Sequence, residues 1–273
     1  MCGRFILVDT IEIIQKEFNV NFNGDFEPNY NISVGQKSLV ITDDKPHQLQ
    51  LFQFGLTPFW AKKQMYLFNA RAEGDSNKEN NPHFSGAKGI ILKPAFRKPI
   101  RSQRCLVIAS AFIEGTTSEG LNKPYVVYLM KRPFAFAGIW DTWTDAETEE
   151  TINSFSIITT TANELLQKIP HHRMPVILAE NNYRHWLSTS SDLGQITRLL
   201  KQYPAKYMNA YAISPDIKSP KNNSKELLNP IGDRISPEFE AKVFRTITQS
   251  GFGHRKKNSD EQKPTMGERH GKS

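Results

Sequence analysis

The chain opens with the stretch around which the rest is organised, Met1-Cys2-Gly3-Arg4-Phe5. Initiator methionine is normally removed when the next side chain is small, so we expect the mature chain to begin with Cys2. Its free α-amine would then stand beside its thiol as a 1,2-aminothiol. Phe5, which two further apolar residues follow, can anchor this end of the chain in the core.

The α-amine of such a residue is a nucleophile at neutral pH, because it titrates at about 7.7–8.0 whereas a lysine titrates at about 10.4. It is the best candidate in the chain for attack on an aldehyde. The thiol could then close a thiazolidine ring, with the advantage of intramolecular reactions, whose effective molarities reach about 10⁵–10⁸ M. We expect Arg4 to favour the thiolate and to attract a phosphate. On these residues alone, Cys2 is equally well explained as a small buried hydrophobic side chain.

The length of the chain limits the number of domains, and its net charge indicates the type of partner. The 273 residues suffice for one large domain or two small ones, and the net charge is +7 from 35 Lys+Arg and 28 Asp+Glu. The segment 255–272 has six Lys or Arg and three Asp or Glu, which leaves a net charge of +4 for the rest. This moderate excess favours a polyanionic partner.

Cysteine usage predicts an intracellular, cytoplasmic protein. Only Cys2 and Cys105 occur, and Cys105 lies in an apolar run where a reduced, buried thiol is expected. The sequence shows no signal-peptide pattern and no run near the roughly 18 apolar residues of a membrane span. We therefore expect no membrane contact.

Periodicity predicts an α+β fold. A helix is predicted to start at Asp9-Thr10, since Ile11, Ile14 and Phe18 recur at helical spacing. Strands are predicted at 38–42, 49–54, 104–113, 124–130, 134–140, 155–160 and 207–213, and further helices at 162–168, 180–187 and 192–203. This order indicates a single domain with a largely antiparallel, barrel-like β core flanked by helices. We predict that the domain spans 1–232, with a terminal helix in 233–250 and a disordered basic tail in 251–273.

Two polar features suggest a site. If 68–73 is a strand, Asn69, Arg71 and Glu73 share one face, which is either a solvated edge or the lining of a site. Glu114 ends an apolar run, which would raise the pKa of a desolvated carboxyl and suit acid/base chemistry. A strand-end glutamate in water is the alternative.

The sequence does not support a metal site or a cofactor-binding site. The neighbours His171 and His172 lack metal-ligand spacing, so we predict no metal site, although one proton-transferring histidine is compatible with the sequence. No Walker loop, dinucleotide-binding turn or Gly-x-Ser-x-Gly elbow occurs, and we predict no cofactor.

Four blocks together resemble the SOS response-associated peptidase (SRAP) family, which protects abasic sites in single-stranded DNA. In the family's order they are Met1-Cys2-Gly3-Arg4-Phe5, Asn69-Ala70-Arg71-Ala72-Glu73, Arg104-Cys105-Leu106 followed by Phe112-Ile113-Glu114, and His171-His172-Arg173-Met174-Pro175. The resemblance spans residues 1 to about 230. It implies a single β-rich fold, a positively charged groove for single-stranded DNA, and a thiazolidine link between the N-terminal cysteine and a ring-opened abasic sugar.

The resemblance also implies roles for particular residues. Cys2 would be the nucleophile, Asn69 would orient the N-terminus and the sugar, Glu114 would shuttle protons, and His171 would be the first histidine of the family's His-x-Arg-Met-Pro. The implied DNA-contacting residues are Arg4, Trp60, Arg71 and Arg97. We accordingly expect a monomeric, DNA-associated enzyme with autoprocessing peptidase, cross-linking and lyase activities, whose Met1 is removed autocatalytically or by an aminopeptidase. Its expected partner is single-stranded DNA containing abasic sites.

The sequence departs from the family pattern at three places. Two other functions also fit the residues. Phe54 and Gly115 stand where tryptophan is common, and Ser110-Ala111 replaces the usual Asp-Gly, which bears on the pocket floor and on base stacking. The first alternative function is an N-terminal-nucleophile peptidase, with Cys2 activated by its own amine or by His171. The second is a non-enzymatic module that binds single-stranded nucleic acid.

Overall fold

The computed structural model describes residues 2–86 and 88–237. From residue 238 onward, the terminal helix predicted for 233–250 lies outside the described residues, as does the whole predicted tail, 251–273. Residues 233–237 contain no helix, and Arg234 forms an isolated β-bridge with Tyr211. Within these described ranges, no helix has the length and apolar character needed to cross a membrane.

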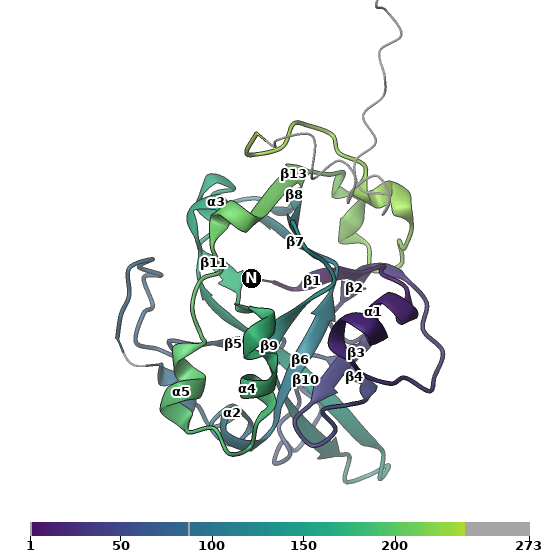
Figure 1. Ribbon diagram of the computed structural model, residues 1–273, viewed down its shortest axis with the longest axis vertical. Helices are drawn as coiled ribbons and strands as arrows, with labels where there is room; N and C mark the ends of the chain where they lie inside the picture. Colours follow the sequence, from purple (N-terminus) through teal and green to yellow (C-terminus); the bar gives the residue numbers. More distant parts are fainter. Residues whose placement is uncertain (1, 87, 238–273) are drawn as a thin grey trace, which may run out of the picture.

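Five strands form an antiparallel sheet in the order β13-β8-β7-β1-β2. Its strands are β1 (Arg4–Leu7), β2 (Asn29–Ser33), β7 (Ala111–Thr116), β8 (Gly120–Leu129) and β13 (Met208–Ala212). Figure 1 shows this sheet above a second group of strands, with the start of β1 between the two. The N-terminal strand is therefore internal to the sheet, paired on both sides.

The second group of strands closes into a barrel. The ring runs β10-β4-β3-β6-β9 and is completed by pairing between β9 and β10. Its members are β3 (Lys37–Thr42), β4 (Leu49–Phe54), β6 (Arg104–Ala109), β9 (Phe134–Thr144) and β10 (Thr151–Thr161), and the short strands β5 (Asn69–Arg71), β11 (Arg173–Pro175) and β12 (Ile177–Leu178) attach to it. The β10 pairings with β4 and β5 are parallel, whereas its pairings with β9 and β11 are antiparallel. The predicted α+β class with a largely antiparallel, barrel-like core is confirmed.

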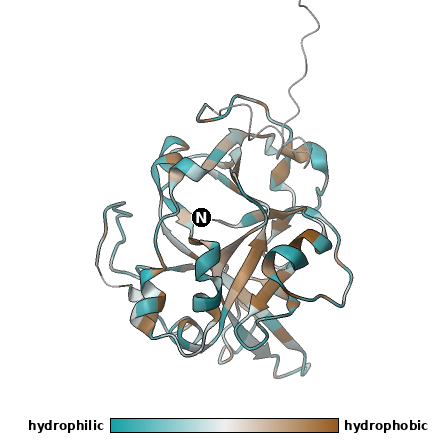
Figure 2. Ribbon diagram, in the orientation of Figure 1, coloured by the Kyte–Doolittle hydropathy of each residue, from teal (hydrophilic) through white to brown (hydrophobic). Residues whose placement is uncertain are grey.

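Short helices surround these sheets. They are α1 (Ile11–Phe18), α2 (Pro99–Ser102), α3 (Glu164–Lys168), α4 (Tyr183–Leu187) and α5 (Leu193–Arg198), with 3-10 turns η1 (Gly89–Leu92), η2 (Glu180–Asn182), η3 (Ala205–Tyr207), η4 (Pro215–Lys218) and η5 (Lys225–Leu228). Thr10 is the N-cap of α1, as its spacing predicted. Figure 2 shows hydrophobic residues concentrated on the barrel strands and hydrophilic ones on helices and loops.

The predicted single strand over 104–113 is wrong, because the chain breaks at Ser110. The Ser110 hydroxyl accepts from the backbone N–H of Val8 at 2.9 Å and donates to Asp9 Oδ2 at 2.5 Å. These bonds turn the chain out of barrel strand β6 and into β7 of the five-stranded sheet. A serine at this position thus joins the two sheets, which strand propensity alone could not reveal.

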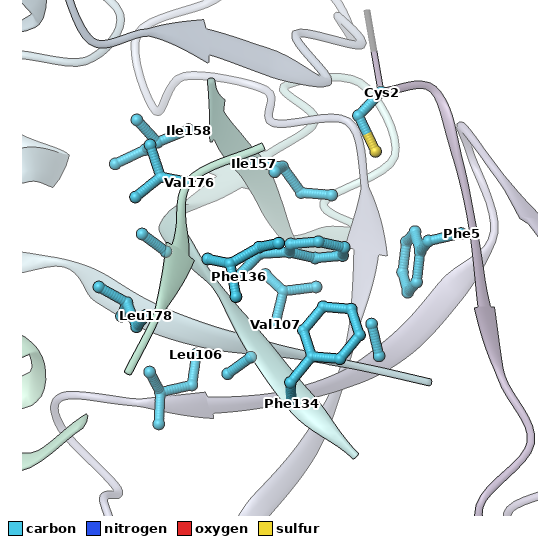
Figure 3. Packing of buried hydrophobic residues seen from close by; sticks show 14 of the residues in the cluster. Cys2, Phe5, Leu106, Val107, Phe134, Phe136, Ile157, Ile158, Val176 and Leu178 are labelled. Carbon is cyan, nitrogen blue, oxygen red and sulfur yellow. The ribbon is translucent and has the colours of Figure 1, made fainter. Parts of the chain in front are cut away.

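The start of the chain anchors the core, as predicted. Phe5 and its two successors are fully buried, and the Phe5 ring packs edge-on against Phe54 at 5.4 Å and Phe136 at 6.0 Å. Figure 3 shows Phe5 beside Phe136 and Phe134. Phe54 also stacks on Phe155 at 5.3 Å, so it fills the barrel. Such aromatic pairs each contribute about 0.5–1.5 kcal/mol beyond their burial.

Candidate active site

Strand pairing fixes the position of the N-terminal cysteine. β1 runs antiparallel to β7 with Arg4 opposite Ile113, so the chain preceding Arg4 passes along Glu114. Cys2 is fully buried, and its thiol lies 3.7 Å from the Arg4 carbonyl oxygen, to which it donates. Figure 3 shows the Cys2 side chain pointing into the core cluster near Phe5. The cysteine, two residues before β1, is therefore held in the core rather than carried on a loose terminus.

Asn69 holds the backbone of Cys2 from the neighbouring barrel. It lies in β5, which pairs in parallel with β10. Its Nδ2 donates to the Cys2 carbonyl oxygen at 3.0 Å and to the Phe68 carbonyl oxygen at 2.9 Å, which fixes the orientation of the amide. Its buried Oδ1 has no hydrogen-bond partner within residues 2–86 and 88–237. That oxygen is an acceptor close to the start of the chain.

The Cys2 thiol is neutral at physiological pH. Burial raises the pKa of the thiol well above its ordinary value, and the nearby charge of Glu114 acts in the same direction. The expectation that Arg4 favours the thiolate is therefore wrong. The Arg4 guanidinium donates to Asn31 Oδ1 at 2.7 Å and to the Lys218 carbonyl oxygen at 2.5 Å, and burial of the sulfur outweighs any stabilisation of its charge.

Glu114 and His171 form an acid–base pair. Both are buried, and His171 Nε2 lies 3.4 Å from Glu114 Oε2. His171 Nδ1 lies 2.7 Å from the Arg173 carbonyl oxygen, which can only accept, so Nδ1 carries the proton and the neutral ring directs its Nε2 lone pair toward Glu114. Burial raises the pKa of Glu114 to about 7 and lowers the pKa of His171 to about 4. The predicted rise for a desolvated Glu114 carboxyl is confirmed.

A cavity of about 400 Å³ opens beside this pair. Its lining includes Gly3, Arg4, Arg71, Glu114, His171 and Arg173. The two sheets thus bring residues from β1, β5, β7 and β11 to one hollow, although they are separated by up to about 170 positions in the sequence. The cavity combines an acid–base pair with cationic side chains, so it suits an anionic substrate that must exchange protons.

Three arginines, Arg4, Arg71 and Arg173, supply the cationic wall. Arg71 Nη2 donates to the Asn77 carbonyl oxygen at 2.5 Å and to Asn80 Oδ1 at 3.1 Å, which ties it to the loop after β5. Arg173 Nη2 forms an ion pair with Glu73 Oε2 at 2.9 Å. In the described part of the chain, Arg71 Nε and both Nε and Nη1 of Arg173 are buried without hydrogen-bond partners. The hydrogen-bonding capacity of these donors is thus unsatisfied among the residues that the structure describes.

Sequence reasoning missed Arg173 as a candidate binding residue. It stands at the start of the apolar run that continues through Met174 to Leu178. A cation in such a run requires a buried anion, and Glu73, at the end of a polar alternation, was the candidate. The two residues are 100 positions apart, so only their contact in the fold connects the two signals.

The wall of the cavity next to Glu114 is backbone. A side chain at Gly115 would place its Cβ 1.9 Å from the Gly120 carbonyl oxygen, so the β7–β8 hairpin closes directly over this position. Both glycines line the cavity. Gly115, where the family commonly has tryptophan, is therefore required by the shape of this hairpin.

Trp60 and Arg97 lie outside the cavity. Trp60 and its neighbour Phe59 are half exposed on the loop that follows β4, and Arg97 is exposed just before α2. The Lys98 ammonium sits 4.4 Å from the centre of the Phe59 ring, so the two segments are adjacent. They form one exposed aromatic and basic surface, separate from the residues that line the cavity.

Comparison with known proteins finds a matching family and similar sequences. Residues 1–220 match the family described as SOS response associated peptidase (SRAP). Abasic site processing protein YoqW of Bacillus subtilis (strain 168) is 36% identical over 238 residues, which cover 84% of this chain and 99% of that protein. Abasic site processing protein HMCES of Mus musculus is 27% identical over 256 residues, covering 78% and 68% respectively.

Solved structures share the fold. A protein from Bacteroides thetaiotaomicron superposes with a TM-score of 0.69 at 28% identity, covering 81% of this chain and 97% of that one. A protein from Bordetella bronchiseptica superposes with a TM-score of 0.62 at 21% identity, covering 78% and 100%. The two-sheet architecture described above is therefore an established fold.

Proposed function

The chain belongs to the SOS response-associated peptidase family, and on this premise we propose that it processes abasic sites by capturing the ring-opened sugar of single-stranded DNA on Cys2. One observation carries the proposal. Asn69 holds the backbone of Cys2 at 3.0 Å, and the next residue, Gly3, lines the cavity that Glu114 and His171 also line. The nucleophile is thus one residue along the chain from a cavity that is lined by a proton-transfer pair and cationic side chains.

The reaction needs a free α-amine on Cys2, so the Met1–Cys2 peptide bond must be hydrolysed first. Water adds to the Met1 carbonyl carbon, the C–N bond breaks, and the nitrogen of Cys2 takes up a proton as methionine leaves. We propose that this cleavage is an autoprocessing peptidase reaction of the same site. An aminopeptidase is the alternative agent, and incubation of a purified chain that still carries Met1 distinguishes the two.

Imine formation follows. The neutral amine adds to the C1′ aldehyde of the sugar to give a carbinolamine, which loses water to form a C=N bond. The first step moves a proton from nitrogen to oxygen, and the second delivers a proton to the leaving hydroxyl. A carboxyl with a pKa of about 7 can do both, because it is half protonated at neutral pH. Asn69 Oδ1 is an acceptor that can orient the amine.

Ring closure makes the link stable. The Cys2 sulfur adds to the imine carbon, a C–S bond forms, and the thiol proton ends on the imine nitrogen. The thiol is neutral because burial raises its pKa, so a base must accept its proton as the bond forms, and the Glu114 carboxylate, whose charge acts on the thiol, is the candidate. The imine is also the branch point to a lyase reaction, in which loss of a C2′ proton expels the 3′ phosphate. Rapid closure by the thiol suppresses that route.

DNA binding is proposed for the arginines and the aromatic loop. Arg71 and Arg173 present buried donors at the cavity, and guanidinium groups suit phosphate oxygens. Arg4 borders the same cavity. Outside it, Trp60 offers an exposed ring on which a base can stack, and Arg97 adds charge beside it.

The test uses the mature chain and a single-stranded oligonucleotide with one abasic site. We expect a species that survives a denaturing gel. The controls are undamaged oligonucleotide and the fraction of chain in which Met1 is still uncleaved after the incubation, and neither should give it. A peptidase that acts on other peptides, or a simple nucleic-acid-binding module, would give no such species, and its absence would overturn the proposal.

A further inference from the structure

We infer that Glu73 is a positioning residue that holds Arg173 in the orientation that binds a DNA phosphate. The inference rests on the proposed function, because it concerns the cationic wall of the same cavity. Glu73 does not line the cavity and would not touch the DNA. Glu73 affects DNA binding through the guanidinium group of Arg173.

The fold fixes Glu73 rigidly behind the cavity. Glu73 is 1% exposed and lies in the turn directly after β5. The next residue, Gly74, has φ of +57°, and a Cβ there would lie 2.7 Å from the carbonyl carbon of Gly89. A Cβ on Gly89 would in turn lie 2.6 Å from the Glu73 carbonyl oxygen. The two segments therefore pack backbone against backbone, which fixes the position of the Glu73 backbone.

Both carboxylate oxygens are engaged. Oε2 contacts Arg173 Nη2 at 2.9 Å, and Oε1 accepts from the Thr160 hydroxyl at 2.8 Å. The same Arg173 nitrogen donates to the Thr159 carbonyl oxygen at 2.9 Å. Burial alone would raise the pKa of Glu73, but the charge and hydrogen bond of Arg173 outweigh it and lower the pKa. The carboxylate is thus ionised and directed at one nitrogen.

These contacts engage only one nitrogen atom of the Arg173 guanidinium. Nη2 makes every hydrogen bond described for the group, whereas Nε and Nη1 have no partner among residues 2–86 and 88–237. Arg173 lines the cavity and is 5% exposed. Glu73 therefore anchors the guanidinium from behind, and the two remaining donor atoms are left for a ligand.

A purely stabilising role explains the geometry less well. A buried ion pair is weak evidence for stability, because desolvation of the two charges offsets their attraction. Leaving buried donors unsatisfied adds a further cost of about 1–3 kcal/mol. That cost is recovered when phosphate oxygens accept from these donors, which a structural ion pair could not achieve.

The test compares Glu73→Gln with Asp75→Asn, a matched control two residues away whose carboxylate is 70% exposed. The probe is an undamaged single-stranded oligonucleotide, whose binding needs no aldehyde chemistry. We expect Glu73→Gln to weaken binding about tenfold and to reduce the salt slope by about 0.7, the loss of one phosphate contact. The cross-linking rate at saturating abasic DNA should stay within about twofold. Asp75→Asn should match the wild type in both measurements.

A double-mutant cycle shows whether Glu73 acts through Arg173. In an Arg173→Gln background, Glu73→Gln should have no further effect on binding. An equal loss in both backgrounds, or wild-type binding by folded Glu73→Gln, would overturn the inference. If Glu73→Gln does not fold, Glu73→Asp keeps the charge on a shorter side chain and should bind more weakly than the wild type, and unchanged binding again overturns it. A wild type that binds the abasic oligonucleotide without cross-linking to it would refute the proposed function but leave this comparison valid.

Discussion

His171 Nε2 lies 3.4 Å from Glu114 Oε2, and the same burial shifts the two groups in opposite directions. It raises the pKa of Glu114 to about 7 and lowers the pKa of His171 to about 4. Just below neutral pH, both groups are therefore mostly uncharged, and their contact is an acid facing a base rather than an ion pair. Such a pair can take up and return a proton as an imine forms and closes.

The first prediction concerns proton transfer by Glu114. Glu114→Gln should slow cross-link formation and its reversal together by about 10²–10⁴-fold, because an amide of the same shape cannot exchange the proton. The inflection near pH 7 in the wild-type rate should disappear as well. Time courses of adduct formation and release, paired with a binding titration, measure this. If Glu114→Gln forms and releases the adduct at the wild-type rates while binding DNA normally, Glu114 is only a strand-end carboxylate with no role in proton transfer.

The opposite shifts also predict opposite slopes of stability against pH. Glu114 binds its proton more tightly in the folded chain than at its ordinary value of 4.5, so it makes the free energy of unfolding fall as pH rises from about 4.5 to 7. His171 binds its proton less tightly than at 6.5, so its contribution is lost as pH falls from about 6.5 to 4. The two nearly cancel in the wild type.

Single substitutions should expose each slope. Glu114→Gln should become more stable as pH rises from 4 to 6.5, whereas His171→Gln should become less stable from 4.5 to 7, each by on the order of 2–3 kcal/mol. Urea unfolding at four pH values across this range measures the difference. Slopes of the same sign in both variants would contradict the opposing shifts.

Cys2→Ala, prepared without Met1, should lose the stable cross-link. The alanine amine can still form an imine, but without sulfur the imine hydrolyses. Borohydride should trap it as a secondary amine, which a denaturing gel detects. A heat-stable adduct formed by this variant without reduction would show that another group closes the ring.

DNA affinity should depend on salt through the cavity arginines. Each neutralised phosphate of a single strand contributes about −0.7 to the slope of log affinity against log salt. Arg71→Ala should flatten that slope by about one such contribution, because its buried Nε would no longer be offered to a phosphate. Lys16→Ala, an exposed residue of α1 that does not line the cavity, is the control and should leave the slope unchanged. Equal slopes for both variants would exclude Arg71 as a phosphate contact.

Gly115→Ala should destabilise the chain, because backbone atoms form the wall of the cavity next to this residue. Its Cβ would lie 1.9 Å from the Gly120 carbonyl oxygen, so the hairpin must shift, at a cost of about 1–3 kcal/mol. Glu114, one residue away, should move with it and cross-linking should slow. Gly120→Ala is the comparison, since its Cβ meets nothing within 4 Å and only its φ of +54° opposes the change, at about 1–2 kcal/mol. Thermal unfolding and cross-linking rates rank the two variants.

The sequence by itself determined the fold class, the family and several local features. Alternation and helical spacing depend on neighbours a few residues apart, so α1 and most barrel strands follow directly from the residues. The chemistry of an N-terminal aminothiol at Cys2 is also local, because its amine and thiol belong to one residue. The rise in the Glu114 pKa followed from the apolar run that precedes it.

Only the tertiary structure decided how the site is assembled. The turn at Ser110 depends on Asp9, about 100 positions away, and so the sequence showed one strand where the fold has two. Arg4 was expected to act on the thiol, but Asn31 and the Lys218 carbonyl engage its guanidinium while burial controls the sulfur. These are effects of long-range contact and desolvation.

The ion pair between Glu73 and Arg173 illustrates the same limit. Each residue was visible in a sequence block, yet nothing local shows that one carboxylate holds one end of the guanidinium and leaves two donor atoms at the cavity. Hydrogen-bond geometry depends on positions in space, and strands β5, β10 and β11 bring these residues together only when the barrel closes. The residue types came from the sequence, and their orientation came from the fold.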